Sequence, residues 1–215
     1  LVVFFNKKIV KVYFLHKLSN WVERDVSFGD FKVKYPNNIY IENLKIKSSK
    51  ALYYDLIFEA DKISITLDLA SFLSGNLRII NSLDINEPKF YLEVVQKKIK
   101  SNNNSVNDTK ISYEDNIGIA KKLNENIPDK IWPAKKRDIN FLILETKIYN
   151  GIAFIKISSI YEQSKIFLSD FEFTLTGNQK ENQHYKDDLK IMLFDILARE
   201  SNLEKKRILK KIYKF

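Results

Sequence analysis

Apolar and polar residues alternate with a period of two through most of the chain from Phe28 to Leu175. In the clearest run, residues 62–69, every second side chain is Ile or Leu, and the others are Lys, Ser, Thr and Asp. This alternation predicts strands with one dry face and one wet face. Little helical sequence separates the strands, which favours antiparallel meanders over parallel βαβ units. The pattern therefore predicts a β-rich (α+β) fold built on an antiparallel β-sheet.

Short polar breaks mark where the predicted strands end. Residues 36–38 (Pro-Asn-Asn) and 150–151 (Asn-Gly) are turn signals, the second of the kind that joins the strands of a hairpin. Pro88 cannot donate to a strand ladder and therefore marks a strand start. Near Ser169 and Asp170 the apolar phase changes, which predicts a bulge or bend in the last run of strands.

Both ends of the chain follow the helical period instead. Ile9 to Val22 predicts an N-terminal helix, and residues 187–215 predict a C-terminal amphipathic helix without Gly or Pro. The second segment forms either one long helix or two short ones divided near Ser201 and Asn202, where a new cap could form. From Leu203 to the end it carries six Lys or Arg against one Glu.

These patterns divide the chain into five segments. Residues 97–110 are rich in Asn, Ser and Lys and contain no sizeable apolar cluster, which is typical of a linker. The predicted segments are an N-terminal helix at 1–26, a first antiparallel β block at 27–96, a polar linker and short helix at 97–137, a second β block at 138–178, and a C-terminal basic helix at 179–215.

Composition removes several kinds of chemistry. The chain has 215 residues, which predicts one domain or one domain with an appendage. It has no Cys, so disulfides, thiolate metal sites and Cys nucleophiles are excluded. Its histidines, His16 and His184, are too few for a histidine-rich metal site, and its five glycines are isolated rather than grouped in a phosphate loop. We therefore expect no enzymatic activity, cofactor or metal.

The formal net charge of +9 favours anionic partners, either nucleic acid or lipid headgroups, unless the charge serves no specific partner. Most phenylalanines, such as Phe31, Phe58 and Phe141, occupy the apolar phase of the predicted strands. A nucleic-acid binder would place its stacking aromatics on the basic face instead. The pattern therefore disfavours nucleic acid as a partner.

The beginning of the chain allows two interpretations. Residues 1–5 are apolar, and Lys7 and Lys8 follow shortly after. They could be the end of a membrane-spanning helix whose beginning lies before Leu1, since a span needs about 20 apolar residues. Alternatively, they are the apolar start of an ordinary amphipathic helix.

Two stretches resemble the N-terminal part of the AsmA/TamB-like family. They are residues 60–80 (ADKISITLDLASFLSGNLRII) and residues 83–93 (LDINEPKFYLE). Both follow the family pattern of an alternating strand, a short turn that ends at Gly75, an Ile-rich strand, and a strand start marked by Pro88. Residues 38–46 fit the preceding family strand, and residues 141–177 repeat the theme more loosely. The chain departs from the family in its short length and in its basic helical end.

The resemblance implies a protein anchored in the bacterial inner membrane, with the bulk of the chain in the periplasm. Relatives of this type build a long curled antiparallel β-sheet with an apolar inner face, so the resemblance implies a curled antiparallel β-sheet or groove between the N-terminal helix and the C-terminal amphipathic helix. They are associated with phospholipid transport and outer-membrane or envelope maintenance, and the family is not known for catalytic residues. The implied partners are a phospholipid or another acyl-chain ligand, the membrane surface, and envelope proteins.

The alternating pattern and the family resemblance together predict two groups of functional residues. The groove-facing candidates for lipid binding are Ile63, Ile65, Leu67, Phe90, Leu92, Val94, Phe141, Ile143, Phe171 and Phe173. The candidates for contact with the membrane surface are Lys7, Lys8, Lys205, Lys206, Arg207, Lys210 and Lys211. The alternative for the first group is a core packed under the terminal helices of an interaction module in an envelope complex. The alternative for the second is a solvated helix face.

Overall fold

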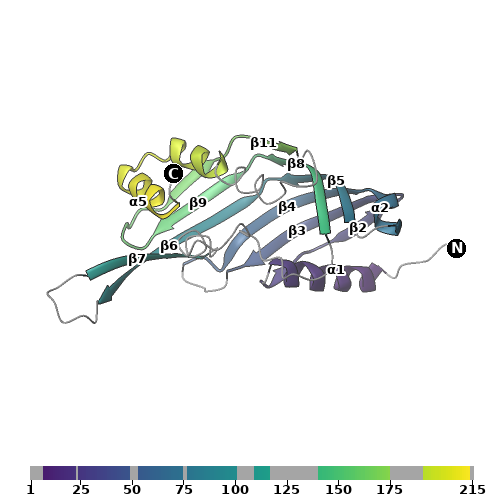
Figure 1. Cartoon of the computed structure of the whole chain (residues 1–215), viewed down its shortest axis with the longest axis horizontal. Helices are drawn as coiled ribbons and strands as arrows, with labels where there is room; N and C mark the ends of the chain where they lie inside the picture. The colour runs from purple at the N-terminus through teal and green to yellow at the C-terminus, as the bar shows by residue number, and fades with distance from the viewer. Residues whose placement is uncertain are drawn as a thin grey trace.

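The computed structural model describes residues 7–22, 24–48, 53–74, 77–100, 109–116, 140–174 and 191–213. In these ranges the chain forms a mixed, open β-sheet flanked by helices from both ends of the sequence (Figure 1). The β-rich fold with terminal helices is confirmed at this level.

The helices in the described ranges are α1 (Lys7–Val22), α2 (Leu69–Ser74), a helix at residues 191–199, and α5 (Leu203–Tyr213). Two short helices therefore form the described C-terminal part, as the second alternative predicted. The side-chain Oδ1 of Asn202 accepts a hydrogen bond from the backbone N–H of Lys205 at 3.0 Å. This contact is an N-cap, and it begins α5 at the predicted division.

The strands are β1 (Val26–Ser27), β2 (Phe31–Lys34), β3 (Asn38–Lys47), β4 (Leu56–Leu67), β5 (Leu77–Asn86), β6 (Lys89–Lys100), β7 (Thr109–Asp115), β8 (Asn140–Tyr149), β9 (Ile152–Ile157), β10 (Ser164–Phe167) and β11 (Phe171–Thr174). Several continue one another end to end, which gives the sheet six rows. In order across the sheet, the first row holds β1 and β2, the second holds β3, and the third holds β4. The fourth row holds β5 and β6, the fifth holds β8 and β9, and the sixth holds β10 and β11.

Two strand pairs are parallel, which corrects the expectation of an antiparallel sheet. β8 runs parallel to β5, and β9 runs parallel to β6. A parallel pair needs a long connection between its strands, and the chain between residues 101 and 139 supplies it. Alternation identifies which side chains share a face, but it does not specify the direction of the neighbouring strand.

Part of the predicted linker is also a β-hairpin. β6 continues to Lys100, and β7 pairs antiparallel with it from Asp115 opposite Val94 to Thr109 opposite Lys100. The prediction for residues 97–137 is therefore wrong at these two stretches, because backbone pairing orders a segment that has few apolar side chains. The predicted short helix near residues 117–127 lies outside the described residues, as does His184.

A crease crosses the sheet at the same level in five of its six rows, all except β4, which runs unbroken from Leu56 to Leu67. Asn43 in β3, Glu87 between β5 and β6, and Asn150 between β8 and β9 have positive φ angles of 55°, 50° and 54°. The two outermost rows are interrupted at the corresponding points, between β1 and β2 and between β10 and β11. Hydrogen bonds still connect the rows there: the N–H of Glu87 donates to the carbonyl of Tyr149 at 2.9 Å.

The crease separates two apolar lines that run from row to row. On one side, the register aligns Phe31, Ile41, Ile63, Ile85, Ile148 and Phe171. On the other side, it aligns Val26, Ile46, Phe58, Phe90, Ala153 and Ile166. One apolar face therefore extends across the whole width of the sheet.

The crease also explains two of the predicted breaks. At residues 150–151 the chain does not reverse, because β9 continues the direction of β8 beside β6; the hairpin turn expected there is wrong. A Cβ on Gly151 would lie 3.3 Å from the side chain of Leu168, so the close approach of the next row favours Gly. The bend expected near Ser169 and Asp170 is confirmed, since it separates β10 from β11.

Candidate functional site on the apolar face

Helix α1 covers one part of the apolar face. Its Phe14, Leu15 and Leu18 pack against a buried cluster that is centred on β2, β3 and β4. Phe14 lies 5.6 Å from the ring of Phe31, which is fully buried. Burial of such side chains supplies most of the stability that holds a helix on a sheet. α1 therefore covers part of the first three rows of the apolar face.

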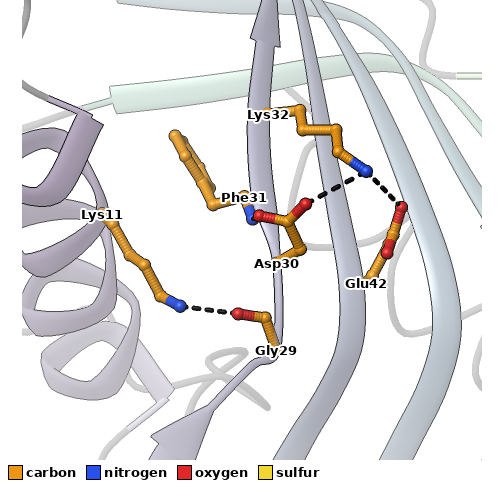
Figure 2. Close-up of polar contacts among 6 residues, drawn as sticks. All are labelled: Lys11, Gly29, Asp30, Phe31, Lys32 and Glu42. Carbon is orange, nitrogen blue, oxygen red and sulfur yellow. Dashed lines mark hydrogen bonds and ion pairs between the residues drawn. The ribbon is translucent and has the colours of Figure 1, made fainter.

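A lysine on α1 reaches the crease beneath the helix (Figure 2). The Nζ of Lys11 donates to the carbonyl oxygen of Gly29 at 2.6 Å, and it also lies 5.1 Å from the centre of the Phe28 ring. On the neighbouring strand, Lys32 forms ion pairs with Asp30 and Glu42, both at 3.0 Å. Lys11 thus joins the helix to the interruption between β1 and β2.

The C-terminal helices cover a second part of the apolar face. Leu193, Ile196 and Leu197 from residues 191–199 join one buried cluster with the inner side of α5 and with β6, β9 and β10. Arg199 fastens this helix to the sheet edge, because its guanidinium donates to the carbonyl of Phe167 at 2.8 Å. Tyr213 at the end of α5 is buried, and burial together with the charge and hydrogen bond of Asp115 raises its pKa well above the usual value.

Lys205 corrects one of the predicted membrane contacts. It is fully buried in α5, and its Nζ donates to the Oγ of Ser164 on β10 at 2.7 Å. A buried ammonium group needs such a partner, because it has lost its hydration. Lys205 therefore joins α5 to the sheet edge and does not reach a membrane surface in this structure.

A strip of half-buried aliphatic side chains adjoins the part of the apolar face that α1 covers. We define this central strip as Leu67, Ile80, Leu83, Ile85 and Ile143. The register joins them across β4, β5 and β8: Leu67 pairs with Ile80, and Ile80 pairs with Ile143. In Figure 1, β5 and β8 lie above α1 and to the right of the C-terminal helices. All members of the strip except Ile143 also pack against the buried cluster that α1 contacts, so the strip extends that cluster toward β8 with half-buried side chains.

The structure divides the predicted groove residues into three groups. Ile63 and Ile65 are buried in the cluster that α1 contacts, and Leu92 and Val94 are buried in the cluster of the C-terminal helices. Half-buried positions are occupied by Leu67, Phe90, Ile143 and Phe171. Phe141 and Phe173 lie on β8 and β11, with side chains outside the description.

The predicted membrane-surface cations are also divided. Lys7 and Lys8 open α1, and their side chains lie outside the description. On α5, Lys206 is half-buried, whereas Arg207, Lys210 and Lys211 are exposed. In Figure 1 the start of α1 and the whole of α5 lie toward different ends of the sheet, so these two groups do not form one basic surface.

The opposite face of the sheet carries an aromatic group that sequence reasoning missed. Tyr91 stacks on Phe154 with ring centres 5.2 Å apart, and Tyr54 contacts Tyr91 at the same distance. Glu93, which is buried, accepts hydrogen bonds from the backbone N–H groups of Tyr53 and Tyr54 at 2.7 and 3.2 Å. The alternating pattern contained a signal for it, because Tyr91 and Phe154 are aromatic residues on the wet phase of their strands.

Burial and charge shift the pKa values of this group. Burial, with contributions from Tyr53 and Glu93, raises the pKa of Tyr54 to about 12. Burial also raises the pKa of Tyr91, and its hydrogen bond to Glu59 adds to the shift. For Glu59 itself, burial acts to raise the pKa. Hydrogen bonds from Tyr91 at 2.8 Å and Lys89 at 3.0 Å outweigh that effect, so its pKa lies below the usual value.

A shallow depression of about 410 Å³ lies on the polar side of the central rows. It is lined by Lys62, Ser64, Asp84, Asn86, Glu145, Lys147 and Tyr149. Lys147 forms an ion pair with Glu145 at 3.0 Å, which accounts for part of the charge there. A row of mixed charges of this kind is typical of a solvated sheet face.

Two further features limit the chemistry of the described residues. None of the helices within the described ranges is both long enough and apolar enough to cross a membrane. In the same ranges, His, Asp and Glu side chains form no group of three that could hold a metal ion.

Comparisons with protein-family models, with curated proteins and with solved structures found no match to this chain.

Proposed function

We propose that this chain is a non-enzymatic, membrane-associated protein that holds acyl chains against the apolar face of its sheet. Its role would be phospholipid transport or maintenance of the bacterial outer membrane and envelope. The resemblance of residues 60–80 and 83–93 to AsmA/TamB-like proteins supports this proposal and favours a place at the inner membrane, with the bulk of the chain in the periplasm.

The central strip is the observation that carries the proposal. Its five aliphatic side chains are half-buried, whereas the clusters that α1 and the C-terminal helices contact contain fully buried side chains. Each buried methylene group of an acyl chain contributes about 0.8 kcal/mol when it leaves water. An acyl chain on this strip would complete the cover that α1 and the C-terminal helices begin.

A matched pair of variants tests the proposal. Leu83 belongs to the strip, and its neighbour Ser82 pairs with Thr66 in the adjacent strand, with its side chain on the other face. We expect the full chain, purified in mild detergent, to retain phospholipid in native mass spectrometry. Leu83→Gln should lower the lipid-bound fraction several-fold, whereas Ser82→Gln should leave it near the wild-type value. No bound lipid in the wild type, or equal loss in both variants, would contradict the proposal.

The extent of the cover favours a second candidate, an interaction module of an envelope complex that binds no lipid. Ile63, Ile65, Leu92 and Val94 are buried by the chain's own helices. This candidate expects the central strip to meet a protein partner. It predicts that Leu83→Gln weakens complex formation in pull-downs from envelope extracts while lipid content stays at background.

A further inference from the structure

Half-buried side chains of the central strip follow one another along the fourth row of the sheet. Ile80, Leu83 and Ile85 lie on β5, and all three pack against the cluster that α1 contacts, so they share the apolar face. Ile80 keeps this face although it lies three positions before Leu83, because the register shifts where β5 passes Thr66 and Leu67. We call these three side chains of β5 the lane.

The lane narrows toward the crease. At its wide end, the residues that pair with Ile80 on β4 and on β8 are half-buried as well. At its narrow end, Ile85 pairs with Ile63 on one side and with Ile148 on the other, and these side chains are 4% and 6% exposed. At the level of Ile85, the fourth row is therefore half-buried between two buried neighbours.

The crease closes the narrow end of the lane. Pro88 is the next apolar residue after Ile85 in the fourth row, and it is fully buried. Ala60, at the same level of the third row, is 2% exposed. A Cβ on Gly151 in the fifth row would lie 3.3 Å from the side chain of Leu168 and 3.6 Å from that of Pro88, so these two side chains converge there. The apolar face is thus filled at the crease, and the lane ends.

The length of the lane matches one acyl chain of a membrane lipid. Ile85 follows Ile80 by five positions on β5. A strand rises about 3.3 Å per residue, so the lane is about 17 Å long. The hydrocarbon core of a bilayer is about 30 Å thick and holds two chains end to end, so one chain extends over about 15 Å.

We infer that the lane binds a single acyl chain and selects its length, with the methyl end at the crease and the headgroup at the end nearest α2. The inference rests on the proposed function and adds the number, direction and length of the chains. A headgroup buried at the crease would lose its hydration at a high cost. The other end meets α2, since the N–H of Asp68 donates to the carbonyl of Ile79 at 3.0 Å. Leu69, which begins α2, is 40% exposed, so a headgroup there stays in water.

A protein segment fits the lane less well than an acyl chain does. β5 pairs with β4 on one side and with β8 on the other, so an extended peptide finds no free row of backbone groups there. A helix has a diameter of about 10–12 Å. The rows that flank the lane are about 10 Å apart, and their side chains at the level of Ile85 are already buried. An acyl chain needs neither backbone partners nor the width of a helix.

The dependence of binding on chain length tests the inference. The full chain is mixed with lysophosphatidylglycerols that carry one saturated chain of about 10 to about 22 carbons, each below its micelle-forming concentration. Native mass spectrometry measures the bound fractions. We expect the affinity to rise about two- to fourfold with each added methylene until the chain fills the lane. It should then level off near the length of an ordinary membrane acyl chain, because further methylenes stay in water.

Two substitutions near the crease should move this break in opposite directions. Ile85→Phe fills the narrow end and should move the break to chains about two carbons shorter. Leu168→Ala removes a side chain that closes the lane and should move the break to longer chains. The matched control is Asp84→Phe, because Asp84 pairs with Ser64 and its side chain lies on the other face; its break should stay at the wild-type length. A variant that simply fails to fold cannot prefer longer chains.

The outcomes distinguish this inference from the proposed function. If the affinity of the wild type rises without a break up to the longest chain, the proposed function stands and this inference fails. The same holds if Asp84→Phe moves the break as far as Ile85→Phe does, or if all chain lengths bind equally. If no chain of any length binds, the proposed function fails and this inference fails with it.

Discussion

Ile41 and Leu44 lie in the same hydrophobic core cluster, although three positions separate them in β3. In a regular strand an odd separation places two side chains on opposite faces. Asn43 lies between them with a φ of 55°, and this left-handed residue returns Leu44 to the face of Ile41. The residue with positive φ resets the alternation of side chains, so the parts of the strand before and after the crease keep their apolar side chains on the same face.

The backbone at Asn43 gives the first prediction. Replacement by Val should lower the free energy of unfolding by about 1–2 kcal/mol, because a β-branched residue is disfavoured in the left-handed region. Asn43→Gly should match or exceed the wild type, since Gly adopts this φ without strain. Urea unfolding measures both.

The control for that prediction is Lys45→Val, at an exposed position of the same strand. Val suits a regular strand, so this change should stay within about 0.5 kcal/mol of the wild type. Equal destabilisation by Val at positions 43 and 45 would show that the positive φ of Asn43 has no energetic consequence.

The contact between Lys11 and Gly29 gives the second prediction. Lys11→Met keeps most of the aliphatic chain but removes the hydrogen bond and the cation–π contact with Phe28. The free energy of unfolding should fall by about 1 kcal/mol, and amide hydrogen exchange in α1 should become faster. Lys34→Met, at an exposed position of β2, should change neither. If amide hydrogen exchange in α1 is the same in Lys11→Met as in the wild type, Lys11 does not link α1 to the sheet.

The buried pair of Ser164 and Lys205 gives the third prediction. Ser164→Ala leaves the ammonium of Lys205 buried without this partner and should cost about 1–3 kcal/mol in the free energy of unfolding. Adding Lys205→Met to Ser164→Ala removes the buried charge that has lost its partner, and should recover most of the lost free energy of unfolding. A double variant less stable than Ser164→Ala would contradict the buried placement of Lys205.

The depressed pKa of Glu59 gives the fourth prediction. A carboxyl with a lower pKa in the folded state contributes stability above its unfolded pKa and loses that contribution as the pH falls through its folded pKa. Tyr91 and Lys89 stabilise the ionised form. The wild type should therefore lose stability on acidification below about pH 4.5, and Glu59→Gln should show a flatter acid limb.

That measurement compares urea unfolding at neutral pH and at acid pH. If Glu59→Gln and the wild type lose equal stability on acidification, the hydrogen bonds from Tyr91 and Lys89 do not hold the carboxylate in its ionised form.

Local features of the fold follow from the sequence, but long-range ones do not. Alternation predicts the strands, and the cap at Asn202 divides the C-terminal helices as expected. The Asn150-Gly151 pair signals a left-handed residue correctly. The local sequence does not determine whether the chain reverses direction after this pair. Here β9 continues in the direction of β8, because it pairs parallel with β6. Strand direction depends on the path of the connection, which side-chain patterns do not encode.

The candidate site shows the same limit. The phase of β4 places Ile63, Ile65 and Leu67 on the apolar face, as predicted, but it cannot say which of them a helix covers. Lys205 is a charged residue for which the sequence predicts exposure, yet it is buried. It faces inward because Ser164 lies within hydrogen-bond reach of its ammonium group. Both outcomes depend on packing between segments that are distant in sequence.

The central claim is that an acyl chain lies along the strip that includes Leu83, and photocrosslinking tests it most directly. A photoreactive amino acid would replace Leu83 in one variant and Ser82 in the other, and membranes that contain the full chain would be illuminated. The account predicts a phospholipid adduct from position 83 and little from position 82. Adducts of equal yield from both positions, or protein adducts alone from position 83, would contradict it.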